Sequence, residues 1–227
     1  MRVLISACLL MIANSPLQAQ TPVSAQAEAI EIETARYLAC LERVETEQDQ
    51  AFEDALAWRM EGGGWPAAHC EALALIALGD ISGGAVTLEE LAATSTGGRD
   101  ALIRSEMLVE AGKAWLRIEQ SAAAQRAFTA ALELAPVDLD ALLGQAQSAL
   151  ALGEWRLAET AASATIAQTP DLAEAWRLRA AARLESGALD TAWQDMETAR
   201  QIEPDNIDIL VLRGRVNEAR RLGALDN

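Results

Sequence analysis

The stretch that decides the fold is residues 173–206, "AEAWRLRAAARLESGALDTAWQDMETARQIEPDN". Two alanine-rich segments, roughly 173–185 and 189–201, carry apolar residues at helical spacing. Gly187 lies between them and tolerates a turn with positive φ, and Pro204 follows where it cannot continue a helix interior. The stretch therefore predicts two antiparallel helices, which are marginal alone and stabilised by stacking on neighbouring units.

The same pattern recurs upstream with a period of 34 residues. Three columns share this period, namely the prolines Pro136, Pro170 and Pro204, the alanines Ala124, Ala158 and Ala192, and the small residues Gly112, Ala146 and Ala180. Small side chains at fixed positions let two helices approach closely. The columns predict three repeats, at residues 105–138, 139–172 and 173–206.

The spacing of Trp176, Ala180, Gly187, Ala192 and Pro204 resembles the signature of the tetratricopeptide repeat (TPR). The resemblance implies an all-α fold, a right-handed superhelical stack of antiparallel helix pairs. An N-terminal region, 20–104, fits the pattern less closely as two degenerate helix pairs at 31–64 and 65–98, with a "STGGRD" linker before the clear repeats. Residues 207–227 are expected to form a capping helix and tail. The sequence departs from the signature where Ala149 and Arg183 stand in place of an aromatic residue.

In TPR proteins the first helices of successive units line a concave groove that holds an extended peptide or a partner's helix. The resemblance transfers the groove-facing positions to Glu106, Val109, Lys113, Arg117, Leu143, Gln147, Leu150, Glu174, Arg177, Leu184, Asp208, Val211 and Arg215. It thus implies a non-catalytic scaffold or adaptor that binds another protein or peptide. The recurring basic residues suggest a partner that carries carboxylates; the alternative is that they are ordinary solvated polar groups.

The N-terminal segment "MRVLISACLLMIANSPLQAQ" has the layout of a secretory signal, with one basic residue before a short apolar run. We expect residues 1–19 to be a signal peptide cleaved after Ala19, because the run is too short to span a membrane. Lipid anchoring at Cys8 is an alternative that the early position of this cysteine disfavours. The sequence predicts an exported, periplasmic protein with an envelope partner and no transmembrane segment.

The formal net charge of −16 disfavours nucleic acid and anionic lipid as general partners. No Gly-rich phosphate loop, metal motif or recognisable carboxylate pair is present in the sequence. We therefore expect no catalytic residue, no metal and no cofactor.

Cys40 and Cys70 would remain after signal cleavage, and an even pair in an exported protein is typical of a disulfide. The two Cα atoms must lie within about 7 Å, which a continuous helix through residues 45–50 would forbid and a turn there would allow. The adjacent His69 is expected to be a partly exposed helix residue. The sequence leaves two further functions open: a thiol redox sensor that uses this pair, or a non-catalytic subunit of an envelope enzyme complex.

Overall fold

The computed structural model describes residues 22–94 and 100–223. The expected signal peptide 1–19 with Cys8, residues 95–99 of the expected linker and the last four residues lie outside the described residues. The described residues form α-helices and no strand, and they divide between Arg36 and Tyr37 into two units, which are treated separately.

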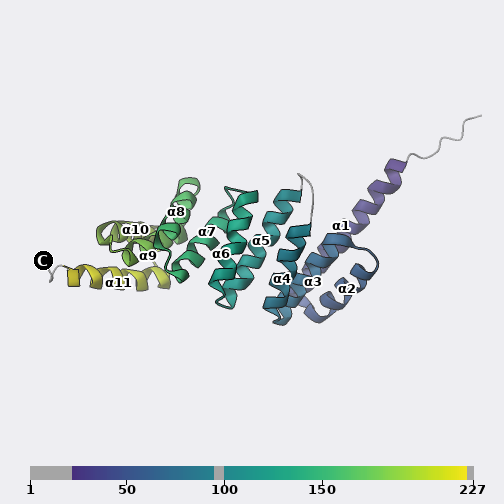
Figure 1. Ribbon diagram of the computed structural model, residues 1–227, viewed down its shortest axis with the longest axis horizontal. Helices are drawn as coiled ribbons and strands as arrows, with labels where there is room; N and C mark the ends of the chain where they lie inside the picture. Colours follow the sequence, from purple (N-terminus) through teal and green to yellow (C-terminus); the bar gives the residue numbers. More distant parts are fainter. Residues whose placement is uncertain (1–21, 95–99, 224–227) are drawn as a thin grey trace, which may run out of the picture. The chain divides into compact units, whose positions relative to one another are not determined.

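Eleven helices are present in the described ranges (Figure 1). They are α1 (Pro22–Thr46), α2 (Gln48–Met60), α3 (Gly64–Leu78), α4 (Ile81–Thr94), α5 (Asp100–Arg117), α6 (Ser121–Leu134), α7 (Leu139–Leu152), α8 (Trp155–Gln168), α9 (Ala173–Glu185), α10 (Leu189–Ile202) and α11 (Ile207–Gly223). The first unit holds the beginning of α1, whose residues 27–36 are all exposed. No described helix is both long enough and apolar enough to cross a bilayer.

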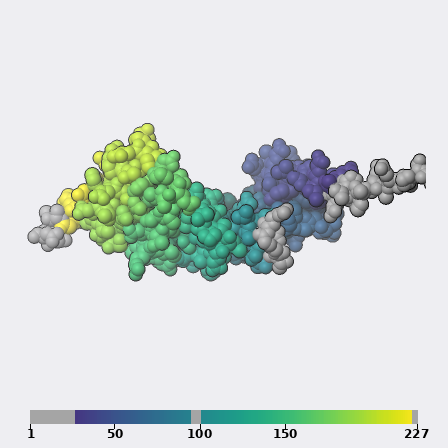
Figure 2. Space-filling model, turned by 90° about the horizontal axis from the view of Figure 1, so that it is seen from above, coloured from purple at the N-terminus to yellow at the C-terminus, as the bar shows by residue number. Residues whose placement is uncertain are grey.

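In the second unit, each helix from α2 to α11 packs against the next one along the chain. The colours of the space-filling view accordingly pass from one helix to its neighbours in sequence order (Figure 2). The described connections between consecutive helices are short. The expected all-α solenoid of helix pairs is confirmed.

The turns within the three clear repeats each contain a residue in the left-handed backbone conformation, with positive φ. Gly153 and Gly187 end α7 and α9 with φ of 76° and 82°, which costs a glycine little because it has no Cβ. Glu119 occupies the same place one period earlier and is the only described non-glycine residue with positive φ, at 59°. The repeat geometry therefore imposes this backbone conformation even where the sequence does not supply glycine.

The small-residue columns lie where helices approach most closely. Ala124, Ala158 and Ala192 are completely buried. The fully buried Phe128 of α6 lies against Gly112 of α5 and Gly144 of α7, so its ring fills space that two missing side chains leave open. The core cluster around Phe128 contains residues of α3, α4, α5, α6 and α7.

An ionic cluster around the buried Asp195 ties α8, α9 and α10 together. The Asp195 carboxylate accepts two hydrogen bonds from Arg179, both at 2.8 Å, and one from Arg183 Nη1 at 2.7 Å. Arg183 also donates from Nε to Glu159 at 2.8 Å. The residue that departs from the repeat signature at position 183 therefore contributes ion pairs instead of aromatic packing.

Candidate functional site

The first helices of successive pairs form one continuous face in the second unit. Helices α5, α7, α9 and α11 each contact the next in this series, in addition to their second-helix partners. We call the side of these four helices that carries the thirteen transferred groove positions the first-helix face. Of those positions, Glu106, Lys113, Arg117, Asp208, Val211 and Arg215 are exposed, and Leu143, Gln147, Leu150, Glu174, Arg177 and Leu184 are half-buried.

Val109 is an exception among the transferred positions. Its side chain is buried and belongs to the core cluster around Phe128. It therefore cannot present a side chain to a partner, and the sequence-based assignment of Val109 to the groove surface is wrong. The packing of α5 against its neighbours buries this side chain.

A pocket of about 400 Å³, here called the groove pocket, opens on this face between α7, α9 and α11. Four of the transferred positions meet there, Gln147, Leu150, Arg177 and Arg215. The sequence missed the other lining residues, which are Ala151, Trp155, Leu178, Ala181 and Glu185. Trp155 could not be found from first-helix positions because it is the first residue of a second helix, α8.

Arg177 is held in place within the groove pocket. It donates two hydrogen bonds to Glu174, from Nε at 2.7 Å and from Nη2 at 2.6 Å. Gln147 Nε2 donates to the same carboxylate at 3.2 Å and so links α7 to α9. The hydrogen bond to Glu174 raises the pKa of Arg177 above its usual value, although burial opposes this shift. The pocket therefore holds a preoriented cation whose charge is already balanced.

The other transferred cations are also paired, with one exception. Arg215 of α11 forms an ion pair with Glu185 of α9, and Lys113 Nζ of α5 lies 2.8 Å from an oxygen of Asp140 in α7. Of the four cations at the transferred positions, Arg117 alone forms no ion pair with the described residues. Basic residues within an acidic protein had suggested a carboxylate-bearing partner, but these pairs leave little unbalanced positive charge on the face.

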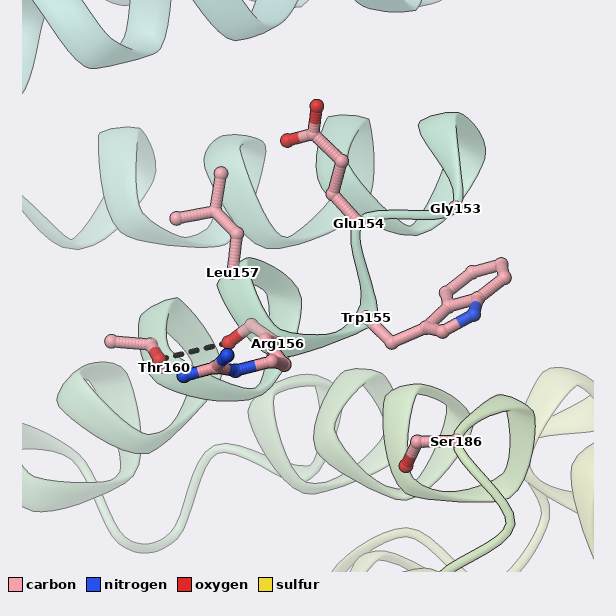
Figure 3. Close-up of a pocket in the computed structure, with 7 residues that line it drawn as sticks. All are labelled: Gly153, Glu154, Trp155, Arg156, Leu157, Thr160 and Ser186. Atoms are coloured by element: carbon pink, nitrogen blue, oxygen red, sulfur yellow. Dashed lines mark hydrogen bonds between the residues drawn. The ribbon is translucent and has the colours of Figure 1, made fainter.

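A second pocket, of about 580 Å³, lies beside the turn from α7 to α8 (Figure 3). Its lining residues are Gly153, Glu154, Trp155, Arg156, Leu157, Thr160 and Ser186. Figure 3 shows the Trp155 ring extending from the start of α8 to lie below Gly153, and the Thr160 hydroxyl donates to the Arg156 carbonyl at 2.8 Å. Trp155 lines both pockets and so connects the groove pocket with this turn.

A buried polar network joins α1, α3 and α5. The Tyr37 hydroxyl lies 2.7 Å from His69 Nδ1, and His69 Nε2 lies 2.5 Å from Glu110 Oε2. A neutral imidazole satisfies both contacts if Nε2–H donates to the carboxylate and Nδ1 accepts from the phenol. His69 is buried, so the expectation of a partly exposed residue is wrong.

Tyr37 is chemically unreactive in this network. Burial, followed by the nearby Glu110 and Glu106 carboxylates, raises its pKa to about 12. Trp65 packs edge-on against the phenol ring, with ring centroids 5.5 Å apart. A phenol that keeps its proton at neutral pH acts as a hydrogen-bond donor and not as a nucleophile or base.

Cys40 of α1 and Cys70 of α3 lie at disulfide distance, with Cα atoms 6.2 Å apart. The turn that this contact requires occurs at Glu47, between α1 and α2 and within residues 45–50. Both cysteines are buried, and the imidazole of His69 is engaged by Tyr37 and Glu110. Within the described ranges, no group of His, Cys, Asp and Glu side chains could hold a metal ion.

No known family profile and no curated protein matches the sequence. Solved structures do match its fold. YrrB, described as a TPR protein with an unusual peptide-binding site, aligns over 85% of this chain and 97% of its own, with a TM-score of 0.66 and 16% identity.

Two further structures support the same fold. The MamA protein aligns over 76% of this chain and 92% of its own, with a TM-score of 0.63 and 19% identity. The first TPR domain of the human RPAP3 protein aligns over 58% of this chain and 100% of its own, with a TM-score of 0.51 and 21% identity. The chain therefore has the TPR fold that the sequence signature implied.

Proposed function

We propose that this chain is a non-catalytic scaffold that binds a segment of a partner protein along its first-helix face, with the groove pocket as the main contact. The observation that carries the proposal is the meeting of Gln147, Leu150, Arg177 and Arg215 in one pocket of peptide-side-chain size. The pocket is lined by α7, α9 and α11, so a segment lying across it would contact two repeats and the last helix. The peptide-binding site attributed to YrrB supports the idea that this fold can serve such a role.

The lining of the groove pocket suggests which partner chemistry it prefers. Leu150, Trp155 and Ala181 offer an apolar wall, which gains free energy when it covers an apolar side chain. Gln147 and the paired arginines offer hydrogen-bond donors that carry little net charge. The pocket therefore suits an apolar anchor residue flanked by backbone carbonyls better than a strongly acidic segment.

Site-specific photo-crosslinking in cells tests this proposal. Ala151 is exposed and lines the groove pocket, whereas Ala167 is exposed on α8 outside it. A photoreactive residue at 151 should capture a distinct partner, and the same residue at 167 should not. Adding Trp155→Ala should abolish the capture, whereas Trp193→Ala on α10 should leave it unchanged. Equal capture from both positions would contradict the groove pocket as the contact.

We also propose that the chain acts outside the cytoplasm, in the periplasm. The signal-like residues 1–19 support this location, and so does a buried cysteine pair at disulfide distance, because disulfides persist in oxidising compartments. Osmotic-shock fractionation followed by thiol alkylation tests it. The chain should be released with the periplasmic fraction, and Cys40 and Cys70 should label only after reduction. A cytoplasmic, freely alkylated chain would refute this location.

The redox-sensor alternative finds no support in the geometry of the cysteine pair. Thiol–disulfide exchange requires an attacking thiolate to reach a sulfur atom, and both Cys40 and Cys70 are buried in a small apolar cluster with Ala55. A buried bridge of this kind is a structural crosslink in our proposal. It would be a sensor only if mild thiol reductants opened it in the folded protein and partner capture changed as a result.

A further inference from the structure

Trp155 joins the groove pocket to the pocket beside the turn from α7 to α8, which we call the turn pocket (Figure 3). Its indole ring rests on the turn itself, because a Cβ built at Gly153 would lie 3.5 Å from Trp155 Cζ2. The ring is half-buried and so keeps a surface that a ligand can cover. A segment bound in the groove pocket can therefore continue past this ring into the turn pocket.

The free hydrogen-bonding groups of the turn pocket are donors. The Thr160 hydroxyl already donates to the Arg156 carbonyl at 2.8 Å, and the Ser186 hydroxyl donates to the Arg183 carbonyl at 3.1 Å. The Trp155 indole N–H and the Arg156 guanidinium, in contrast, make no hydrogen bond and no ion pair with the described residues. Because indole and guanidinium groups donate and do not accept, they favour a ligand that brings acceptor oxygens.

The carboxylate that lines the turn pocket does not neutralise Arg156. Glu154 accepts a hydrogen bond from Gln125 of α6, and Figure 3 shows its side chain extending in a different direction from the Arg156 guanidinium. In the groove pocket, Arg177 and Arg215 are each paired with a glutamate. Arg156 is therefore an unpaired cation beside a site whose own cations are already balanced.

The repeat itself does not require a cation at position 156. One period earlier and one period later the same column holds Ala122 and Asp190, and all three residues are exposed. The positive charge thus belongs to the middle repeat alone, within a chain of net charge −16. Because the Debye length is about 8 Å at physiological ionic strength, a single carboxylate at Arg156 is attracted locally. A strongly acidic segment would instead be repelled by the rest of the surface.

We propose, on the basis of the proposed function of the groove pocket, that Arg156 selects a partner segment in which one Asp or Glu stands beside the apolar anchor residue. The anchor fills the groove pocket and covers Trp155 from that side. The neighbouring carboxylate accepts hydrogen bonds from the Arg156 guanidinium, and a backbone carbonyl of the segment accepts from the Trp155 indole N–H. The cation that reads the partner's acidic residue therefore lies on a second helix, not among the first-helix positions.

Selection of a random displayed peptide library against the immobilised chain tests this preference. The parent chain should enrich peptides with an apolar residue and an Asp or Glu close to it. Arg156→Glu should keep the apolar residue and exchange the acidic preference for Lys or Arg. Arg126→Glu is the matched control, because Arg126 is exposed on α6, lines neither pocket and forms no ion pair with the described residues. It should select the same peptides as the parent.

Fluorescence anisotropy with an enriched acidic peptide and its amide twin, Asn for Asp or Gln for Glu, measures the contact directly. Arg156→Ala should weaken binding of the acidic peptide about two- to fivefold, as expected for an exposed ion pair. The same variant should bind the amide twin as the parent does, and Arg156→Lys should retain most of the preference. High salt should remove the difference between the two peptides, because it screens an exposed pair.

The results separate this inference from the function on which it rests. If the parent enriches apolar peptides and Trp155→Ala loses them, the groove pocket stands as the contact. An enrichment without acidic residues, or an acidic preference that survives Arg156→Glu, then overturns the role of Arg156 alone. If the parent enriches no peptide, or Trp155→Ala selects the same peptides, both proposals are overturned.

Discussion

Tyr37 is the only tyrosine of the chain, so the ultraviolet absorbance of phenolate reports this residue alone. Its pKa is raised from 10.0 to about 12, first by burial and then by the Glu110 and Glu106 carboxylates. A raised pKa in the folded state means that folding keeps a proton which the unfolded chain releases. The contribution of Tyr37 to stability is therefore complete below pH 10 and is lost as pH rises toward 12.

We expect the phenolate absorbance of the folded chain to have its midpoint near pH 12, and that of the chain in denaturant near pH 10. Urea unfolding at a series of pH values checks the linkage, because the free energy of unfolding should fall between pH 10 and 12. In Tyr37→Phe this part of the decline should disappear. A folded-state midpoint near 10 would show that the phenol is neither buried nor close to Glu110.

Phe128 makes the glycine columns sensitive to a single methyl group. A Cβ at Gly144 would lie 2.1 Å from Phe128 Cζ, and the ring cannot retreat because Gly112 flanks it on the other side. We expect Gly144→Ala to lower the free energy of unfolding by about 1–3 kcal/mol through overpacking. Gly214→Ala, which meets nothing within 4 Å in the described part of α11, should instead raise it by about 0.5–1 kcal/mol. Urea titration at low protein concentration measures the free energy of unfolding of both variants. Equal changes in the two variants would contradict the overpacking of Phe128 at Gly144.

For single residues, the sequence predicted which positions are tightly packed better than it predicted which side chains pair with each other. The period of 34 residues located Gly112, Ala124 and Ala146 in the columns that pack closely. It could not reveal that Asp195 would neutralise Arg179 and Arg183, because ion pairs between helices depend on rotamers and not on register. It also placed His69 at the surface, since its two partners lie 32 and 41 residues away in sequence.

At the scale of helices, the Cys40–Cys70 pair fixes α1 to α3. The bridge would close a loop with a sequence separation of 30 residues, for which chain entropy suggests about 3–4 kcal/mol of stabilisation. We expect the double variant Cys40→Ala/Cys70→Ala to lose a stability of this size and to melt at a lower temperature. Because a repeat contacts only its neighbours, hydrogen exchange should accelerate in α2 and α3 but not in α8 and α9.

The same double variant distinguishes a structural bridge from a functional one. With Ala151 as the crosslinking position, partner capture well below the melting temperature should match that of the parent chain. The thiol-reduced parent should behave like the double variant in both stability and capture. Uniform acceleration of hydrogen exchange across all helices would refute the view that the bridge stabilises only the N-terminal helices.

Helix boundaries were predictable where turn chemistry is explicit in the sequence. Gly153 and Gly187 mark the ends of α7 and α9 as expected from their freedom to adopt positive φ. The break at Glu47 carries no glycine or proline, and it was inferred only because the cysteines could not otherwise meet. Four of the expected groove positions line the groove pocket, whereas the place of Trp155 depends on how α8 enters the face from its turn.

At the scale of the second unit, the core is continuous where the sequence suggests a boundary. The weaker repeats before residue 98 and the clear repeats after residue 105 share one cluster, in which Leu88 of α4 and Met107 and Leu108 of α5 are buried together. Their packing means that α4 covers α5 as one repeat covers the next. The N-terminal helices therefore protect the first clear repeat and are not an appended segment.

We expect a fragment that begins at Asp100 to be less stable than the whole chain, because it uncovers Met107 and Leu108. Burial of each such side chain contributes about 1.5–3 kcal/mol, so the free energy of unfolding should fall by several kcal/mol. Hydrogen exchange should show α5 losing protection while α9 and α10 keep theirs, since their contacts are with α7, α8, α11 and each other, all of which the fragment retains. Deletion of residues 22–36, all exposed where their side chains are described, is the matched control and should leave the stability of the monomer unchanged. A fragment with full protection in α5 would mean that the clear repeats fold independently of α1–α4, and the shared cluster would then contribute little to stability.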